Sequence, residues 1–230
     1  MFVFVARNIH TLNYVWRIDS SQMSDLNQLH LGLDKEHPVL NVIPHDGQAT
    51  YHGPVFSHSE ADAHLQSMID VIPWQHDEIM MFGKKIITAR QVAWFGDPHL
   101  NYTYSGKTRT SIPWTDQLLT IKDHIEKLTG VIYNSCLLNL YANGEQGMGW
   151  HSDDEKELGP KPNIASVSFG AIRRFDFRHK QTKEKISVTL DHGSLLMMCG
   201  LTQTHWQHQI PKTKKVTSPR INLTFRTINP

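Results

Sequence analysis

The feature that most constrains the fold is a run of short apolar segments between residues 134 and 227, separated by glycine, proline, asparagine or charged turns. Segments of this length and composition are typical of β-strands. We place the strands at 134–141, 148–152, 164–170, 173–179, 185–190, 194–199, 204–210 and 220–227. About eight strands without an intervening helix predict a jelly roll, in which two antiparallel sheets pack face to face.

Two amphipathic helices are expected before this run. The first has Ser59 as its N-cap and an apolar stripe that ends at Pro73, and the second spans about 115–129 and stops at Gly130. Short strands are expected at 38–43 and 49–56, and further β-like segments over 79–106. We therefore predict one α+β domain over 1–230, mainly β: a double-stranded β-helix over about 134–227 with helices packed outside.

Composition excludes several classes of protein. The chain is 39% hydrophobic and 20% charged, and no apolar run approaches the roughly 18 residues that a membrane helix needs. The apolar opening, Met1 to Ala6, is too short for a signal peptide, so we expect a cytoplasmic chain without a membrane partner, near the nucleoid in a bacterium or nuclear in a eukaryote. Cys136 and Cys199 lie in apolar segments, and we expect buried, reduced thiols.

Basic residues gather in two segments although the net charge is only +1. One holds Arg173, Arg174, Arg178, Lys180, Lys183 and Lys185, and the other holds Lys212, Lys214 and Lys215. Both segments have the charge to neutralise phosphates. Solvated hairpin tips have the same composition, so the pattern alone leaves both interpretations open.

Potential metal ligands occur in His-x-Asp/Glu pairs at His58, His124 and His151. The first two pairs fall at or inside the expected helices and are interpreted as surface residues. His151 and Asp153 instead follow a strand and a glycine-rich turn, which delivers side chains to the mouth of a sheet. With His208 they would form a two-histidine, one-carboxylate site, which leaves three positions open on Fe(II). Zinc is the rival metal, because hydrolases use the same ligands.

The last strand carries a second pattern. Its alternation puts Arg220, Asn222, Thr224 and Arg226 on one face and apolar residues on the other. Asn139 and Tyr141 share a face of an earlier strand in the same way. Buried arginines need anions, and two of them suit a small dicarboxylate held at both ends. Ion pairs between these arginines and protein carboxylates are the alternative interpretation. A hydrolase has no use for a pair of arginines that binds a dicarboxylate, so the pattern favours iron over zinc.

These motifs together resemble the AlkB family of Fe(II)/2-oxoglutarate dioxygenases, from about residue 40 to the end. The resemblance implies that iron is bound by His151, Asp153 and His208; by spacing alone His205 is an alternative to His208. It implies that Arg220 pairs with the far carboxylate of 2-oxoglutarate, helped by Tyr141 and Asn222. It also implies that Arg226 pairs with the near carboxylate, helped by Asn139.

On the substrate side the sequence is similar to the branch of the family that repairs duplex DNA, which implies a nucleotide-recognition lid over about 75–110. Tyr104 is expected to stack on an extruded base opposite the His151 ring. The other substrate-binding residues implied are a wedge at Phe82, a backbone contact at Lys84, a DNA contact at Arg90, pocket residues Tyr102 and Ser105, and a base-edge contact at Glu155.

The function that this resemblance implies is oxidative demethylation of bases such as 1-methyladenine and 3-methylcytosine in DNA, duplex DNA included, by a monomer. The reaction uses Fe(II), 2-oxoglutarate and O2, and it releases succinate and formaldehyde. RNA or single-stranded nucleic acid is the alternative substrate for the same chemistry. A non-catalytic damage binder and a zinc hydrolase are more distant alternatives.

Overall fold

The computed structural model describes residues 40–81, 84–98, 100–104 and 107–229, and side chains are described outside 78–86 and 101–109. These residues belong to one compact unit, Pro38–Pro230. A single domain over 1–230 therefore stays a prediction. Among the described residues no helix combines the length and the apolar character needed to span a bilayer.

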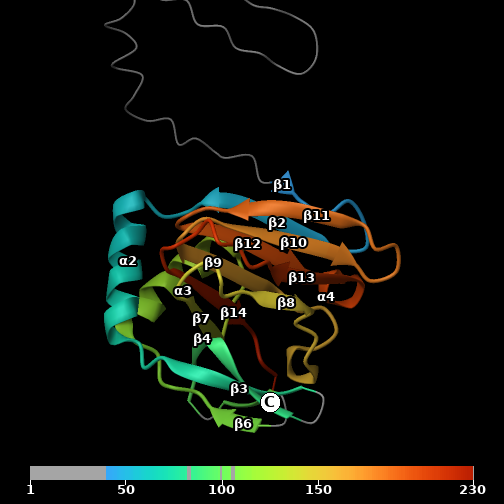
Figure 1. Ribbon diagram of the computed structural model, residues 1–230. Helices are drawn as coiled ribbons and strands as arrows, with labels where there is room; N and C mark the ends of the chain where they lie inside the picture. Colours follow the sequence, from blue (N-terminus) through green and yellow to red (C-terminus); the bar gives the residue numbers. More distant parts are fainter. Residues whose placement is uncertain (1–39, 82–83, 99, 105–106, 230) are drawn as a thin grey trace, which may run out of the picture. The chain divides into compact units, whose positions relative to one another are not determined.

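Two antiparallel sheets and a hairpin make up the described part (Figure 1). The larger sheet runs in the order β1 (Leu40–Asn41), β2 (Gln48–Pro54), β12 (Ser194–Cys199), β9 (Ile164–Gly170), β14 (Arg220–Arg226), β7 (Ser135–Tyr141), β4 (Lys84–Gly96) and β3 (Gln75–Met81). The smaller sheet runs β11 (Lys185–Leu190), β10 (Arg173–His179), β13 (Trp206–Ile210) and β8 (Met148–His151), and the hairpin pairs β5 (Asn101–Tyr104) with β6 (Lys107–Thr110). The predicted mainly β jelly roll is confirmed.

Helices α2 (His58–Val71) and α3 (Asp116–Thr129) lie beside the larger sheet (Figure 1). Helix α3 ends at Gly130 as predicted, because that residue takes the left-handed conformation, with φ 68°. The prediction of Ser59 as N-cap of the first helix was wrong. Ser57 is the N-cap, since its hydroxyl accepts from the Glu60 backbone while the Glu60 carboxylate returns to the Ser57 backbone, completing a capping box.

Alternating residues of the larger sheet enter two separate cores. Leu195 and Met197 pack with the buried faces of α2 and α3, whereas Leu196 and Met198 pack between the two sheets. The helices therefore cover one face of the larger sheet, and the smaller sheet covers the other. A pocket opens between the two sheets, where polar residues replace the apolar core.

The strand predicted at 204–210 starts later than expected. A one-turn helix, α4 (Thr202–His205), precedes β13, and a 3-10 turn, Lys156–Leu158, follows β8, so the run of strands is not free of helix. The buried Thr202 hydroxyl bonds to the carbonyls of Cys199 and Gln48, which turns the chain after β12. Cys136 and Cys199 are both free thiols as predicted, with Cys136 buried and Cys199 half-buried.

The loop 142–147 lies directly against the loop that follows β13. Gly144 exchanges backbone hydrogen bonds with Thr213 and Val216, and a Cβ atom on Gly144 would lie 2.3 Å from the Thr213 carbonyl oxygen. Only glycine permits this approach. The buried Arg173 guanidinium joins the two loops by donating to the carbonyls of Asn143, Gly144, Gln146 and Pro211. Arg173 is thus a structural residue, and its inclusion among the possible phosphate contacts was wrong.

Replacing Arg173 with Met should lower the free energy of unfolding by about 3 kcal/mol, because buried carbonyl oxygens lose their donors. Denaturant unfolding measures the change. Lys185→Met is the matched control, since this lysine is exposed on the neighbouring strand, and it should change stability by less than about 0.5 kcal/mol. Equal effects of the two substitutions would contradict the structural role of Arg173.

Candidate metal centre and anion pocket

Three potential metal ligands converge at the edge of the smaller sheet. His151 ends β8 and pairs in register with His208 of β13, and Asp153 follows two residues later. Their donor atoms all lie within 4.8 Å of one another, with His151 Nε2 3.8 Å from Asp153 Oδ1. The Nδ1 atom of His151 lies 2.8 Å from the Gly149 carbonyl oxygen. Because a carbonyl only accepts, Nδ1 carries the hydrogen, and Nε2 keeps a lone pair for a metal.

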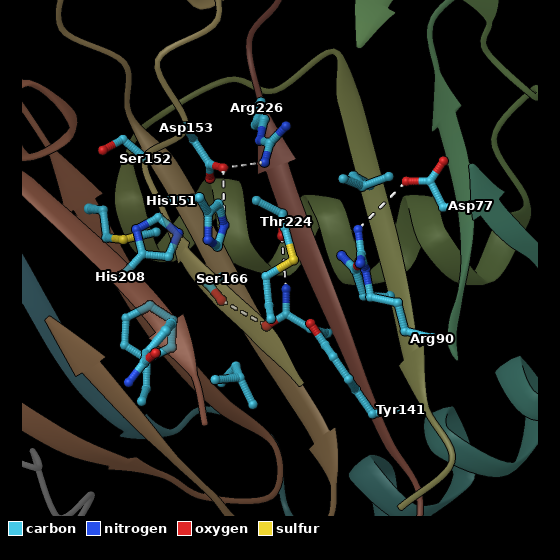
Figure 2. Close-up of a pocket in the computed structure, with 18 of the residues that line it drawn as sticks. Asp77, Arg90, Tyr141, His151, Ser152, Asp153, Ser166, His208, Thr224 and Arg226 are labelled. Carbon is cyan, nitrogen blue, oxygen red and sulfur yellow. Dashed lines mark hydrogen bonds and ion pairs between the residues drawn. The ribbon is translucent and has the colours of Figure 1, made fainter. Parts of the chain in front are cut away.

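Burial and nearby charges set the ionisation that a cation needs. Burial lowers the pKa of His208 to about 3, so its imidazole is neutral at physiological pH. Burial raises the pKa of Asp153, but the positive charge of Arg226, 3.0 Å away, outweighs burial and lowers the pKa. The neutral His208 imidazole and the Asp153 carboxylate are therefore ready to bind a cation without losing a proton, beside the His151 ring (Figure 2).

Neither the pair at His58 nor the pair at His124 brings its histidine and glutamate together as metal ligands. His124 Nε2 lies 2.9 Å from the Val55 carbonyl oxygen. His58 clusters with Asp62 and His192 rather than with Glu60, and that cluster is largely exposed and lines no part of the pocket. His205, the alternative ligand, stacks on His179, with ring centroids 6.1 Å apart, and lines no part of the pocket. His208 therefore lies close enough to His151 and Asp153 to share a metal with them, and His205 does not.

Arg220 makes the pocket an anion site. It is 1% exposed, and its Nη2 atom donates to Ser168 and Asn222. Its Nε and Nη1 atoms are buried without a hydrogen-bond partner in the described part of the chain. Burial lowers the pKa of Arg220 to about 10, which still leaves the guanidinium charged at neutral pH. A buried cation with two unused donors fits a carboxylate with two oxygen atoms.

The other polar residues of β14 also face the pocket, as their alternation predicted. The Asn222 carbonyl oxygen accepts from Arg220 and from Ser166, and its amide donates to Thr224. Asn222 thus orients Arg220, while Arg226 holds Asp153. The alternative of internal ion pairs applies to Arg226 only, since no carboxylate of the described residues pairs with Arg220.

Asn139 and Tyr141 line the same pocket from β7. The Arg220 guanidinium carbon lies 5.6 Å from the centroid of the Tyr141 ring. Asn139 Oδ1 accepts a 2.9 Å hydrogen bond from Nε of Arg90, which is itself only 7% exposed. Arg90 therefore lies inside the pocket, and its contact with DNA stays a prediction.

The remaining substrate-side residues are described to different degrees. Glu155 lines the pocket, and its Oε2 atom is buried without a hydrogen-bond partner in the described part of the chain. Lys84, Tyr102 and Tyr104 lie on β4 and β5, but their side chains are outside the described residues, as are Phe82 and Ser105 entirely. Their roles, and the lid over 75–110, stay predictions.

Several pocket residues were not found from the sequence. Ser166 and Ser168 alternate with apolar residues on β9, and this polar face is a signal that could have indicated them. Asp77 is 2% exposed and lies 3.6 Å from Arg90. Its strand shifts register between His76 and Glu78, so alternation gives no guide to where Asp77 points.

The sequence of residues 48–226 matches the model of the 2OG-Fe(II) oxygenase superfamily. Over 185 residues the chain is 43% identical to DNA oxidative demethylase ALKBH2 of Homo sapiens, covering 76% of this chain and 71% of that protein. The chain belongs to the AlkB family of 2OG-Fe(II) oxygenases. It is also 42% identical to alpha-ketoglutarate-dependent dioxygenase alkB homolog 3 of Homo sapiens over 181 residues, 74% of this chain and 63% of that one.

Among solved structures, an AlkB-family protein described as OsALKBH1 superposes with a TM-score of 0.57 at 15% identity, covering 83% of this chain and all of that one. At this identity the likeness supports the fold alone. Membership of the family makes Fe(II), 2-oxoglutarate and O2 the cofactor and co-substrates. The residues present fit them: His151, Asp153 and His208 offer three ligands, and Arg220 offers the unused donors for a carboxylate.

Replacing His208 with Ala should weaken binding of Mn(II), used as an oxygen-stable substitute for Fe(II), by at least about 100-fold, because one of three ligands is lost. Titration calorimetry measures the affinity. His205→Ala is the matched control and should bind Mn(II) as the unmodified chain does. If His205→Ala lost the metal and His208→Ala kept it, the assignment would be reversed.

Proposed function

We propose that this chain oxidatively demethylates N-alkylated bases in DNA, of the 1-methyladenine and 3-methylcytosine type, and so repairs them by direct reversal. The observation that carries the proposal is the 43% identity to a DNA oxidative demethylase over three quarters of this chain. The mouse protein of the same name is 39% identical over 208 residues, 86% of this chain and 87% of that protein. The complete metal and anion sites support a catalytic role rather than a damage binder.

The pocket supports a base as the substrate. His151 is half-buried and presents its ring at the edge of the cavity, and the buried Glu155 oxygen has an unused acceptor. Methylation at N1 of adenine or N3 of cytosine leaves an exocyclic amine and a positive charge, and a carboxylate favours both. In this proposal Glu155 receives the amine edge of the extruded base, and Tyr104 and His151 enclose its faces.

His151, Asp153 and His208 would hold Fe(II), and Arg220 would hold 2-oxoglutarate; when bound, they would supply the oxidation of the methyl C–H bond by O2, with 2-oxoglutarate converted to succinate and CO2. The chain contributes position and charge. Arg220 holds the far carboxylate, Arg226 keeps Asp153 ionised beside the metal, and the base is clamped so that its methyl group alone faces the metal. Hydroxylation of the methyl carbon makes it leave the ring nitrogen as formaldehyde, which restores the base.

The outer surface supplies cations for the nucleic-acid backbone. Five lysines are exposed on the turns and strand ends of the two basic segments: Lys183, Lys185, Lys212, Lys214 and Lys215. Exposed lysines without buried partners have the character of phosphate contacts, whose contribution falls as salt rises. We further propose that a single chain carries out the reaction, because the ligands and the anion site all come from one chain.

Incubation with a duplex oligonucleotide that carries 1-methyladenine should release formaldehyde and succinate in equal amounts, and only when 2-oxoglutarate and Fe(II) are present. The control is Asp153→Ala, which lacks the carboxylate ligand and should release neither product. Intact methyl groups with an iron-loaded chain that still consumes 2-oxoglutarate would overturn the DNA substrate. Binding of methylated DNA without succinate release would favour the damage binder instead.

The strand preference rests on Phe82, the expected wedge. Phe82→Ala should reduce demethylation of the duplex at least about tenfold and leave a single-stranded DNA or RNA oligonucleotide within about twofold, because only the duplex requires a filler for the gap left in the stack. Initial rates on matched oligonucleotides measure the ratio. An equal loss on both substrates would contradict the wedge and favour single-stranded DNA or RNA as the substrate.

A further inference from the structure

Arg90 is a buried cation that belongs to the pocket rather than to the surface. It lies on β4, is 7% exposed, and lines the cavity together with Asn139 and Asp77. Figure 2 shows Arg90 and Asp77 joined by their ion pair. The Nη2 atom of Arg90 is 3.6 Å from Asp77 Oδ2, and its Nε atom donates to Asn139 Oδ1 at 2.9 Å. A guanidinium in this position is linked to protein partners on both sides, on β3 and on β7.

The bond from Arg90 determines which way the Asn139 amide points. A side-chain amide has an oxygen that accepts and a nitrogen that donates, and either could face a given neighbour. Arginine only donates, so it can bond to the oxygen of Asn139 and never to its nitrogen. With Oδ1 turned toward β4, the Nδ2 hydrogens remain for the pocket, where no described hydrogen bond to the protein uses them.

The amide so oriented stands beside the carboxylate-binding strand. Asn139 pairs in register with Asn222 of β14 and with Val92 of β4, so it occupies the strand between Arg90 and the strand of Arg220 and Arg226. Rotation of the amide by half a turn would instead present its oxygen to the pocket. An oxygen there would repel a carboxylate, whereas the NH2 group attracts one.

We propose that Arg90 is a positioning residue for 2-oxoglutarate, acting through Asn139, whose amide nitrogen it holds toward the co-substrate. The inference rests on the 2-oxoglutarate chemistry of the family and not on the nucleic-acid substrate proposed above. It also connects β3 and β4 with the co-substrate site, because Asp77 on β3 lies beside Arg90 on β4.

The test separates co-substrate binding from DNA binding. Arg90→Met should raise the Kd for 2-oxoglutarate about tenfold, measured by anaerobic calorimetry on the Mn(II)-loaded chain without DNA. The Kd for a methylated duplex, measured by fluorescence anisotropy, should stay within about twofold. At saturating 2-oxoglutarate the loss in turnover should be mostly recovered, so that KM for 2-oxoglutarate changes more than kcat.

A double-mutant cycle shows whether the effect passes through Asn139. Asn139→Ala alone should weaken 2-oxoglutarate about as much as Arg90→Met, and the double variant should be no weaker than either. Independent contributions that multiply in the double variant would overturn the proposal. Unchanged 2-oxoglutarate affinity with weakened DNA binding would also overturn it, in favour of a DNA contact.

Two further variants guard against a trivial loss of structure. Arg90→Met removes the ion pair that buried Asp77 makes with Arg90, so Asp77→Asn combined with Arg90→Met should restore the melting temperature but not the affinity for 2-oxoglutarate. Arg178→Met is the matched control and should leave the Kd for 2-oxoglutarate unchanged, because that arginine stacks on Trp150 and lines no part of the pocket. If the neutral pair regained 2-oxoglutarate affinity, Arg90 would be only a partner for Asp77 and the proposal would fail.

Discussion

The pairing of β8 with β13 is the contact on which the candidate site depends, because it sets His151 opposite His208. The pairing in turn depends on how closely two loops approach. Gly144 and Gly147 have no side chain where one would strike the backbone after β13, and Arg173 bonds the loops through four carbonyl oxygens. Arg173 thus joins the loop before β8 to the loop after β13, next to the strand pairing that carries the two histidines. The glycine-rich turn therefore supports the candidate metal centre, although no glycine is a ligand.

Buried positive charge organises the rest of the pocket. Arg220 and Arg226 extend from β14 into a space between the sheets, and Arg90 enters from β4, on the far side of β7. Such charges are costly unless an anion or a hydrogen-bond network receives them. Within the protein, Asp153 pairs with Arg226 and Asp77 pairs with Arg90. The amide oxygens of Asn139 and Asn222 accept hydrogen bonds from Arg90 and Arg220, and two donors of Arg220 remain for a carboxylate from outside. The pocket is therefore prepared for a dicarboxylate before one arrives.

The sequence predicted those features that short-range pattern controls. Strand alternation placed Arg220, Asn222, Thr224 and Arg226 on one face, and Gly130 ended its helix as expected. Prediction from the sequence failed where tertiary contacts determine the role of a residue. Ser57 and Ser59 are equally plausible caps until the Glu60 carboxylate is seen to return to Ser57, and Arg173 looks like a surface cation until the loop carbonyls surround it. The contact between Arg90 and Asn139 joins residues 49 apart in the chain, which no local periodicity reveals.

The metal and co-substrate sites are tested most directly by a crystal structure of the chain grown anaerobically with Mn(II) and 2-oxoglutarate, with the metal located by its anomalous scattering. We expect one ion bonded to His151, Asp153 and His208, and a far carboxylate bonded to the Nε and Nη1 atoms of Arg220. An ion held instead by the cluster of His45, Asp46 and His179, or a dicarboxylate bound away from Arg220, would contradict this expectation.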